Sequence, residues 1–210
     1  MNNVEFKGFD SKDFDVFTID GLEPRMDALI QTIRPKLTTI GEQIQPYLAT
    51  LCGEEMYVHV AKHARRTVNP PKDTWVAWAS NKRGYKALPH FEVGMFGSHV
   101  FIVFAIIYES PRKVDFGKAL QTNWKKVKQM IPDEFYWSTD HMSPQANIQG
   151  ELDDQYWLDT AERLQHVKKS EIVCGLRIEK EDPLLQDGKA FIEKVEQTFE
   201  QLLPLYRMAF

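Results

Sequence analysis

Residues 56–109 read MYVHVAKHARRTVNPPKDTWVAWASNKRGYKALPHFEVGMFGSHVFIVFAIIYE, and this stretch decides the fold class. Its apolar and polar residues alternate in short runs rich in Val, Ile, Phe and Trp, which is typical of β-strands. Four strands are predicted, at residues 56–63, 74–80, 90–96 and 99–109. Turn-forming residues separate them: Asn-Pro-Pro after the first, Gly84 after the second, and Gly97-Ser98 after the third. Because these connections are short, we expect the strands to pair as an antiparallel meander.

Helical patterns flank the four strands on both sides. Before them, apolar residues of segment 22–51 recur at three- and four-residue steps. Pro35 and Pro46 should kink or break this segment into two or three helices. After the strands, residues 171–180 alternate and predict a fifth strand with one polar face. Three further segments have the helical spacing: 116–131, 152–167 and 191–206.

This order of helices, strands and helices indicates the α+β class. We expect an antiparallel sheet of about five or more strands, with a central meander, packed with N- and C-terminal helices. The fourth strand is apolar on both faces, so it should lie centrally in the sheet and be covered on both sides. With 210 residues, the chain is expected to form a single globular domain, residues 1–210.

Composition favours a cytoplasmic globular protein. The net charge is −4 and the isoelectric point is near 5.9, whereas domains dedicated to binding duplex nucleic acid usually have values above about 9. Cys52 and Cys174 have no partners at metal-site spacing, which suits a reducing compartment. Residues 1–17 lack the basic start and the apolar run of a signal peptide. The longest apolar run is well short of the about 20 residues that a membrane helix requires, so no membrane association is expected.

Positive charge is concentrated between residues 57 and 91. This segment has seven basic residues and one acid, Asp73, and its net charge of +6 leaves −10 for the rest of the chain. Half of the six histidines lie in the same segment. The basic residues are Lys62, Arg65, Arg66, Lys72, Lys82, Arg83 and Lys86. This uneven charge is the most informative feature of the sequence.

Short catalytic and cofactor motifs are absent from the sequence. It contains no phosphate-binding loop, no dinucleotide-binding glycine motif, no zincin or nucleophile-elbow motif and no CxxC pair, so no cofactor is predicted. His59 and His63 lie on a predicted strand about 13 Å apart, which is too far to share one ion, so no metal site is predicted. Asp140 and His141 fall in residues 138–151, an expected flexible loop. An acid/base pair is one interpretation of these two residues, but in a polar loop we expect both side chains to be solvated.

Pairing the predicted strands around their turns assigns side chains to two faces. The pairing sets Trp78 opposite both His59 and Glu92, and residues that lie opposite share a face. One face is then apolar and carries Val58, Val60, Trp75, Ala77, Phe91, Val93 and Met95. The other carries Tyr57, His59, His63, Trp78, His90 and Glu92. Two interpretations of this second face stay open: a wall of a ligand cleft with proton-exchanging groups, or a partly exposed surface whose histidines bond to their neighbours. A slip of one residue would exchange the two faces of a strand.

Two basic clusters lie in the loops between these strands. The first is Arg65-Arg66, and the second is Lys82, Arg83 and Lys86. Such side chains bind phosphate or carboxylate groups. Successive turns of a meander lie at opposite ends of the sheet, about 20 Å apart. The clusters therefore form two separate basic ends, unless curvature brings one loop over the sheet face.

Several long strings of the sequence resemble one family of bacterial proteins. They are VAKHARRTVNPPKDTWVAW at 60–78, KRGYK at 82–86, PHF at 89–91, FAIIYESP at 104–111 and LLPLY at 202–206. On these strings the chain resembles, nearly end to end, the YktB-like family of uncharacterised proteins. The resemblance implies a single-domain cytoplasmic protein of mixed α/β architecture. It transfers no catalytic residue, because the family is a domain of unknown function.

The leading hypothesis is a binding domain for an anionic ligand, either a phosphorylated small molecule or single-stranded nucleic acid. The ligand-binding residues would be Arg65, Arg66, Lys82, Arg83, Lys86, Tyr85, Trp78, His59 and His63. One alternative is an enzyme that uses His59, His90 and Glu92 as acid/base groups on a carboxylate or phosphate substrate. Another alternative is a domain that binds a protein partner.

Overall fold

The computed structural model describes residues 5–210. Its centre is one sheet of seven strands, all paired in antiparallel fashion, in the order β1-β2-β3-β4-β7-β5-β6. The strands are β1 Tyr57–Val60, β2 Asp73–Ala79, β3 His90–Phe96, β4 His99–Ile106, β5 Tyr136–Ser138, β6 Asn147–Ile148 and β7 Ile172–Glu179.

Helices precede and follow the meander. They are α1 Ser11–Asp15, α2 Leu22–Ala28, α3 Arg34–Cys52, α4 Arg112–Met130, α5 Asp154–His166 and α6 Gly188–Met208. Shorter helical turns are η1 Val16–Thr18, the π-helical η2 Leu29–Ile33, η3 Gln149–Glu151 and η4 Pro183–Gln186. Between residues 5 and 210, none of the helices combines the length and the apolar character that crossing a membrane demands.

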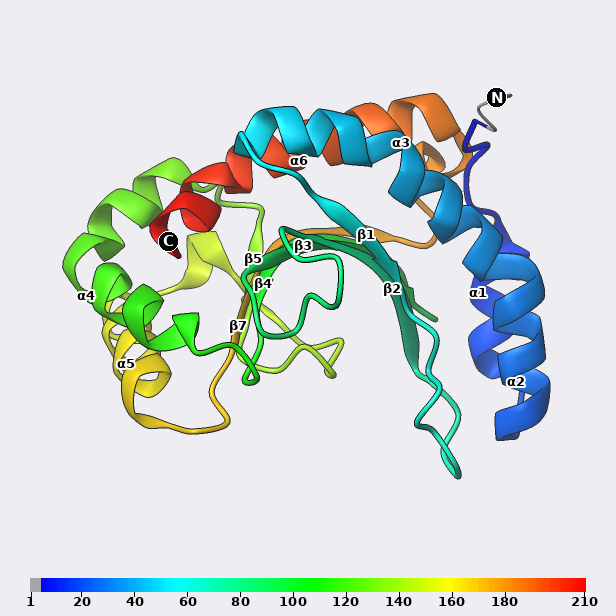
Figure 1. Cartoon of the computed structure of the whole chain (residues 1–210), viewed down its shortest axis with the longest axis horizontal. Helices are drawn as coiled ribbons and strands as arrows, with labels where there is room; N and C mark the ends of the chain where they lie inside the picture. The colour runs from blue at the N-terminus through cyan, green and yellow to red at the C-terminus, as the bar shows by residue number, and fades with distance from the viewer. Residues whose placement is uncertain (1–4) are drawn as a thin grey trace.

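The sheet is strongly curved, and the helices lie along its convex side (Figure 1). Helix α3 packs on β1 and β2, and α6 packs on β3, β4 and β7. Helices α4 and α5 pack on each other at the end of the sheet that holds β7 and β5. Loops, and no helix of the described residues, cross the concave side (Figure 1). Loops rather than helices therefore cover this side of the sheet, and most of its side chains are buried beneath them.

A tryptophan joins the helices to β2. Trp78 is fully buried, its Nε1 donates a hydrogen bond to the carbonyl oxygen of Gly41 at 3.0 Å, and its ring packs edge-on against Phe199 of α6 at 5.6 Å. Gly41 lets α3 approach the sheet, because a Cβ atom there would lie 2.6 Å from Cγ1 of Val58. Truncating a buried tryptophan typically costs about 3–5 kcal/mol, so this contact is a main source of stability.

The predicted α+β class is confirmed, and so is the central position of β4, all of whose residues are buried. The first helical segment is broken as expected near Pro35, which lies at the start of α3 after the π-helical turn. Pro46 does not end the helix, because α3 continues through it to Cys52. Gly53 then ends α3 in the left-handed conformation, with φ of 76°.

Two strands were not expected from the sequence. Residues 138–151, predicted as a flexible loop, begin at the last residue of β5 and contain both β6 and η3. Strand β5 has three residues and pairs with both β7 and β6, and β6 has only two residues. Segments this short carry no periodic pattern, so their structure comes from the strand beside them.

The predicted register of β2 is wrong by one residue. In the structure Ala77 pairs with both His59 and Glu92, so Trp75 lies on the same face as these polar residues. Trp78 lies instead in the core beneath the helices, so its predicted place on the polar face is also wrong. Both faces of β2 carry apolar residues and each has one tryptophan, so the alternation of this strand does not determine its register.

Candidate functional site

Alternate residues of the strands point toward the concave side of the sheet. We call this surface the concave face, and its members are His59, Asp73, Trp75, Ala77, His90, Glu92, Phe101, Val103, Ala105, Tyr136, Val173, Gly175 and Arg177. The apolar members of β4 and β7 form a small second core, against which Trp75 packs. Polar and titratable side chains occupy the rest, so the face combines aromatic surface with acid and base groups.

Two loops converge on Trp75, which is half-buried. Its Nε1 donates a hydrogen bond to the hydroxyl of Tyr85, in loop 80–89, at 2.8 Å. On the other side, the ring of His63, in loop 61–72, meets the Trp75 ring edge-on at 5.4 Å. A third loop, 139–146, is held to the same face because Arg177 donates to the carbonyl oxygen of Pro144 at 3.1 Å. Loop 80–89 thus folds over the sheet face, and both loops that carry basic clusters contact one side chain.

Histidines surround Tyr85 and Trp75. The ring of Tyr85 lies 5.5 Å from that of His59 and 4.9 Å from that of His90. Burial lowers the pKa of His59. Burial, followed by the positive charge of Arg66, lowers the pKa of His63 to about 4. His59 and His63 are therefore neutral near pH 7 and can accept or donate hydrogen bonds without adding charge.

His90 and Glu92 form a buried, hydrogen-bonded pair. His90 Nδ1 lies 2.7 Å from the carbonyl oxygen of Leu88, which only accepts, so Nδ1 is the donor. His90 Nε2 lies 3.2 Å from Oε1 of Glu92. These bonds hold the imidazole and the carboxyl group together beneath Tyr85.

Asp73 is the most unusual carboxylate of the concave face. It is only 3% exposed, and its Oδ1 has no hydrogen-bond partner among residues 5–210. Burial, together with the negative charge of Glu92, raises the pKa of Asp73 to about 6, although Arg66 and His141 act in the opposite direction. Asp73 therefore changes protonation state close to neutral pH, as catalytic and ligand-binding carboxylates commonly do.

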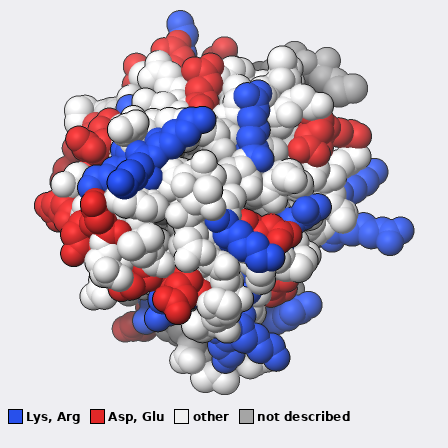
Figure 2. All heavy atoms as spheres, turned by 90° about the vertical axis from the view of Figure 1, so that its left-hand side faces the viewer, with Lys and Arg blue, Asp and Glu red and all other residues white. Residues whose placement is uncertain are grey.

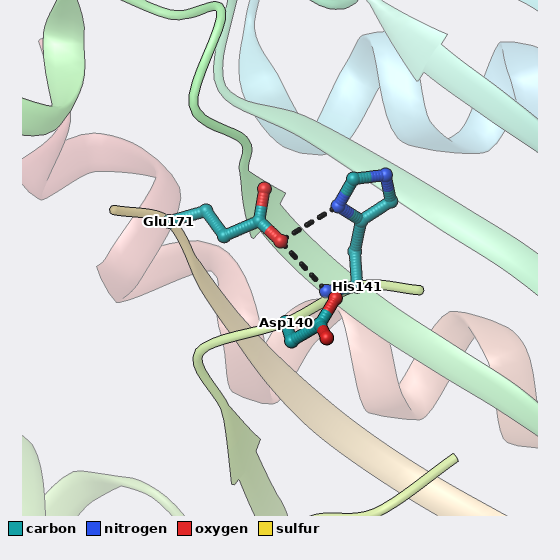
Figure 3. Close-up of side chains that lie close together, drawn as sticks. All are labelled: Asp140, His141 and Glu171. Carbon is teal, nitrogen blue, oxygen red and sulfur yellow. Dashed lines mark hydrogen bonds and ion pairs between the residues drawn. The ribbon is translucent and has the colours of Figure 1, made fainter. Parts of the chain in front are cut away.

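A second cluster joins loop 139–146 to the start of β7 (Figure 3). Glu171 Oε1 accepts hydrogen bonds from the backbone N–H and from Nδ1 of His141, both at 2.8 Å. Burial opposes charge on His141, but the bond to Glu171 and the charges of Glu171, Glu92 and Asp73 outweigh it and raise the pKa of His141. The side chain of Asp140 lies beside this pair, and one ligand atom from each of the three residues lies within 4.8 Å of the others. Carboxylate oxygens and an imidazole nitrogen at this spacing are able to hold a metal ion.

The predicted basic residues are spread over the two loops. Lys86 pairs with Glu109 at 3.5 Å, and half-buried Arg66 donates to the carbonyl oxygen of Asn69 at 3.5 Å. The remaining three, all exposed, are Arg65, Lys82 and Arg83. In contrast, the side of the molecule formed by α4 and α5 has positive and negative side chains intermixed (Figure 2). That side has no surface of one sign to attract a charged ligand.

Sequence reasoning did not include Asp73, Trp75 and Glu171 among the candidate site residues, and it expected His141, which bonds to Glu171, to be solvated. Trp75 was assigned to the core because of the register slip, and Asp73 was counted only as the lone acid of a basic segment. The His141–Glu171 contact joins residues 30 positions apart and leaves no pattern in the sequence. His59, His63 and Tyr85 do come together with Trp75, whereas Trp78 lies on the opposite side of the sheet.

The chain matches one family along most of its length. A family model described as "Domain of unknown function (DUF1054)" matches residues 9–206. The chain belongs to this DUF1054 family. A UPF0637 protein of Bacillus velezensis and one of Bacillus licheniformis are each 48% identical to it over 200 residues, which cover 95% of this chain and 95% of each relative. A UPF0637 protein of Bacillus cereus is 47% identical over 200 residues, covering 95% of this chain and 96% of that protein.

Membership in the DUF1054 family confirms the resemblance seen in the sequence strings. The family description assigns no activity, so the function of the chain is unknown at the level of its family. The function of the concave face is therefore inferred from its own side chains.

Proposed function

We propose that the concave face binds an anionic small molecule that carries a phosphate group, with Trp75 at the centre of the site. One observation carries this proposal: loops 61–72 and 80–89, which hold the two basic clusters, both contact Trp75. A ligand lying over Trp75 would therefore be within reach of cations from both sides.

The chemistry of the loops supports a phosphorylated ligand. Guanidinium groups bind phosphate oxygens in pairs, and Arg65, Arg66 and Arg83 supply three of them. The half-buried ring of Trp75 and the hydroxyl of Tyr85 provide a flat surface and a polar contact for the rest of the molecule.

The proposal extends to the setting of the protein. Residues 1–210 would form a single domain that works in the cytoplasm, where Cys52 and Cys174, both free thiols, remain reduced.

Titration calorimetry with inorganic pyrophosphate and with a short single-stranded oligonucleotide, each at low and moderate salt, tests the proposal. We expect pyrophosphate to bind and its affinity to fall with salt. The double variants Arg65→Ala/Arg66→Ala and Lys82→Ala/Arg83→Ala should each weaken binding by about tenfold or more, since each removes two cations. The matched control, Lys125→Ala/Lys126→Ala, removes the same charge from exposed positions on α4 and should bind as the unchanged protein does. Salt-independent binding, or equal affinity in all three variants, would refute the electrostatic basis. If the oligonucleotide bound more tightly than pyrophosphate, the ligand of the site would be single-stranded nucleic acid and not a small molecule.

A second candidate function is acid/base catalysis on a phosphate or carboxylate substrate. The observation that favours it is the hydrogen-bonded pair His90–Glu92 on the same face as Asp73, whose pKa is raised to about 6 by burial. Hydrolysis assays on simple phosphate monoesters and carboxylate esters, with Glu92→Gln as the inactive form, check it. Turnover that Glu92→Gln abolishes while pyrophosphate still binds supports catalysis, and equal rates in both proteins contradict it.

A partner-binding role has less support. The exposed large apolar side chains of residues 5–210 are distributed over many elements, and single exposed apolar residues are ordinary on protein surfaces. They include Ile30, Val68, Tyr108, Met130, Met142 and Leu158.

A further inference from the structure

We infer that Asp140, His141 and Glu171 form a binding site for a divalent first-row metal cation, such as Mn²⁺ or Zn²⁺, at the edge of the concave face. Figure 3 shows the carboxylate of Glu171, the residue preceding β7, directed at the ring and backbone of His141 in loop 139–146, with the carboxylate of Asp140 beside the His141 backbone. His141 Nδ1 and Glu171 Oε1 are 2.8 Å apart, and one carboxylate oxygen of Asp140 lies within 4.8 Å of both. When an ion binds, Nδ1 releases to solvent the proton that it donates to Glu171, so both atoms become ligands. Ligand atoms held about 2.1 Å from one ion are about 3 to 4 Å from each other, so a small rotation of exposed Asp140 completes the geometry.

The backbone around Asp140 is already shaped to present these groups. Strand β5 ends at Ser138, whose hydroxyl accepts a hydrogen bond from the backbone N–H of Asp140 at 3.2 Å. Asp140 Oδ1 accepts from the backbone N–H of Met142 at 2.9 Å, which fixes the turn. Glu171 is only 5% exposed, and its Oε2 accepts from the backbone N–H of Tyr108 at 3.3 Å. The bonds among Glu171, Tyr108 and His141 therefore hold two of the ligands in place, and Asp140 is the one that adjusts.

The ligand set selects the class of ion. Carboxylate and water ligands alone suit Mg²⁺ and Ca²⁺, whereas an imidazole nitrogen favours the later first-row metals. With one imidazole and two carboxylates, Mn²⁺ and Zn²⁺ match the site best. This inference does not depend on the anionic ligand proposed above, because it concerns different side chains.

The test is a titration of the full chain with Mn²⁺ in a phosphate-free buffer, followed by electron paramagnetic resonance of the free ion, with Zn²⁺ as competitor. We expect a single Mn²⁺ site that Zn²⁺ displaces. Asp140→Asn and His141→Ala should each weaken Mn²⁺ binding by at least about tenfold, because even the partners of metal ligands contribute about that much. The same changes at exposed positions remote from the face, Asp27→Asn on α2 and His166→Ala on α5, should leave the affinity unchanged.

Two results would overturn the inference: no binding of either cation at millimolar concentration, or equal Mn²⁺ affinity in the unchanged protein and in Asp140→Asn. Circular dichroism checks that each variant is folded. Since Asp140 is exposed, its amide variant keeps the test decisive even if His141→Ala unfolds. Because no phosphate compound is present, the metal site and the anion site fail or succeed separately.

Discussion

Replacing Asp73 by asparagine should stabilise the protein, which is the reverse of the usual effect of changing a buried residue. Burial and the neighbouring charge of Glu92 raise the pKa of Asp73 from 3.8 to about 6, so the ionised form is less stable in the folded chain than in the unfolded one. A carboxyl group whose pKa is higher in the folded chain than in the unfolded chain stabilises the fold while it is protonated. This stabilisation is lost as the pH rises through about 6. Asparagine resembles the protonated acid and removes the penalty.

The expected gain follows from the two pKa values. The difference between 3.8 and about 6 corresponds to a gain of up to about 3 kcal/mol at pH 8, falling to roughly half of that at pH 5. If the amide group fitted the buried site less well than the acid, the gain in stability would be smaller by the same amount at both pH values. Urea unfolding of both proteins at the two pH values, with a chelator present, measures the difference. Asp159→Asn, at an exposed position on α5, is the matched control and should change nothing. A loss of stability in Asp73→Asn that is equal at pH 5 and pH 8 would show that Asp73 is not strained by its charge.

Three further outcomes are expected. His99 is buried, and burial followed by the charge of Arg177 lowers its pKa to about 4, so stability present above pH 6.5 is lost as the pH falls toward 4. His99→Phe should therefore reduce the loss of unfolding free energy between pH 7 and pH 4.5 by about 2 kcal/mol, and an unchanged loss would contradict the burial argument. Gly175→Ala should cost at least about 2 kcal/mol in urea unfolding, because its Cβ would lie 2.1 Å from the carbonyl oxygen of Ile102, a backbone atom that cannot move aside. Gly84→Ala, with no atom within 4 Å of the new Cβ, should be nearly neutral, and similar values for both glycines would refute the packing explanation. Trp75→Phe removes the hydrogen bond to Tyr85, so amide hydrogen exchange in loop 80–89 should accelerate, and unchanged exchange there would mean that this bond does not hold the loop.

The meander could be predicted because its local signals agree. Strong turn residues separate the four runs, and β4 is apolar on both faces, which indicates a central strand. The same logic fails for β5 and β6, which are too short to show alternation. Their positions depend on pairing with β7, which lies many residues further along the chain.

The candidate site was predicted only in part, for a related reason. His59, His90 and Glu92 were assigned to one polar face correctly, because the alternation of β1 and β3 is clear. Trp75 was assigned to the wrong face because the predicted register of β2 is off by one residue. Both faces of this strand carry apolar residues, so its pattern does not fix the register. The contact between His141 and Glu171 forms only in the folded chain, because the two residues are 30 positions apart, and no local sequence pattern predicts it.

The position of the bound anion can be followed through the indole N–H signals of the five tryptophans in nitrogen–proton correlation spectra. The Trp75 signal is assigned by its disappearance in Trp75→Phe, and pyrophosphate is then added to saturation. Binding over the concave face should shift the Trp75 signal, because its Nε1 bonds to Tyr85 between the two basic loops, and should leave the buried Trp157 signal in place. A Trp75 signal that stays unmoved at saturation, while those of other tryptophans shift, would place the anion elsewhere and contradict the proposed site.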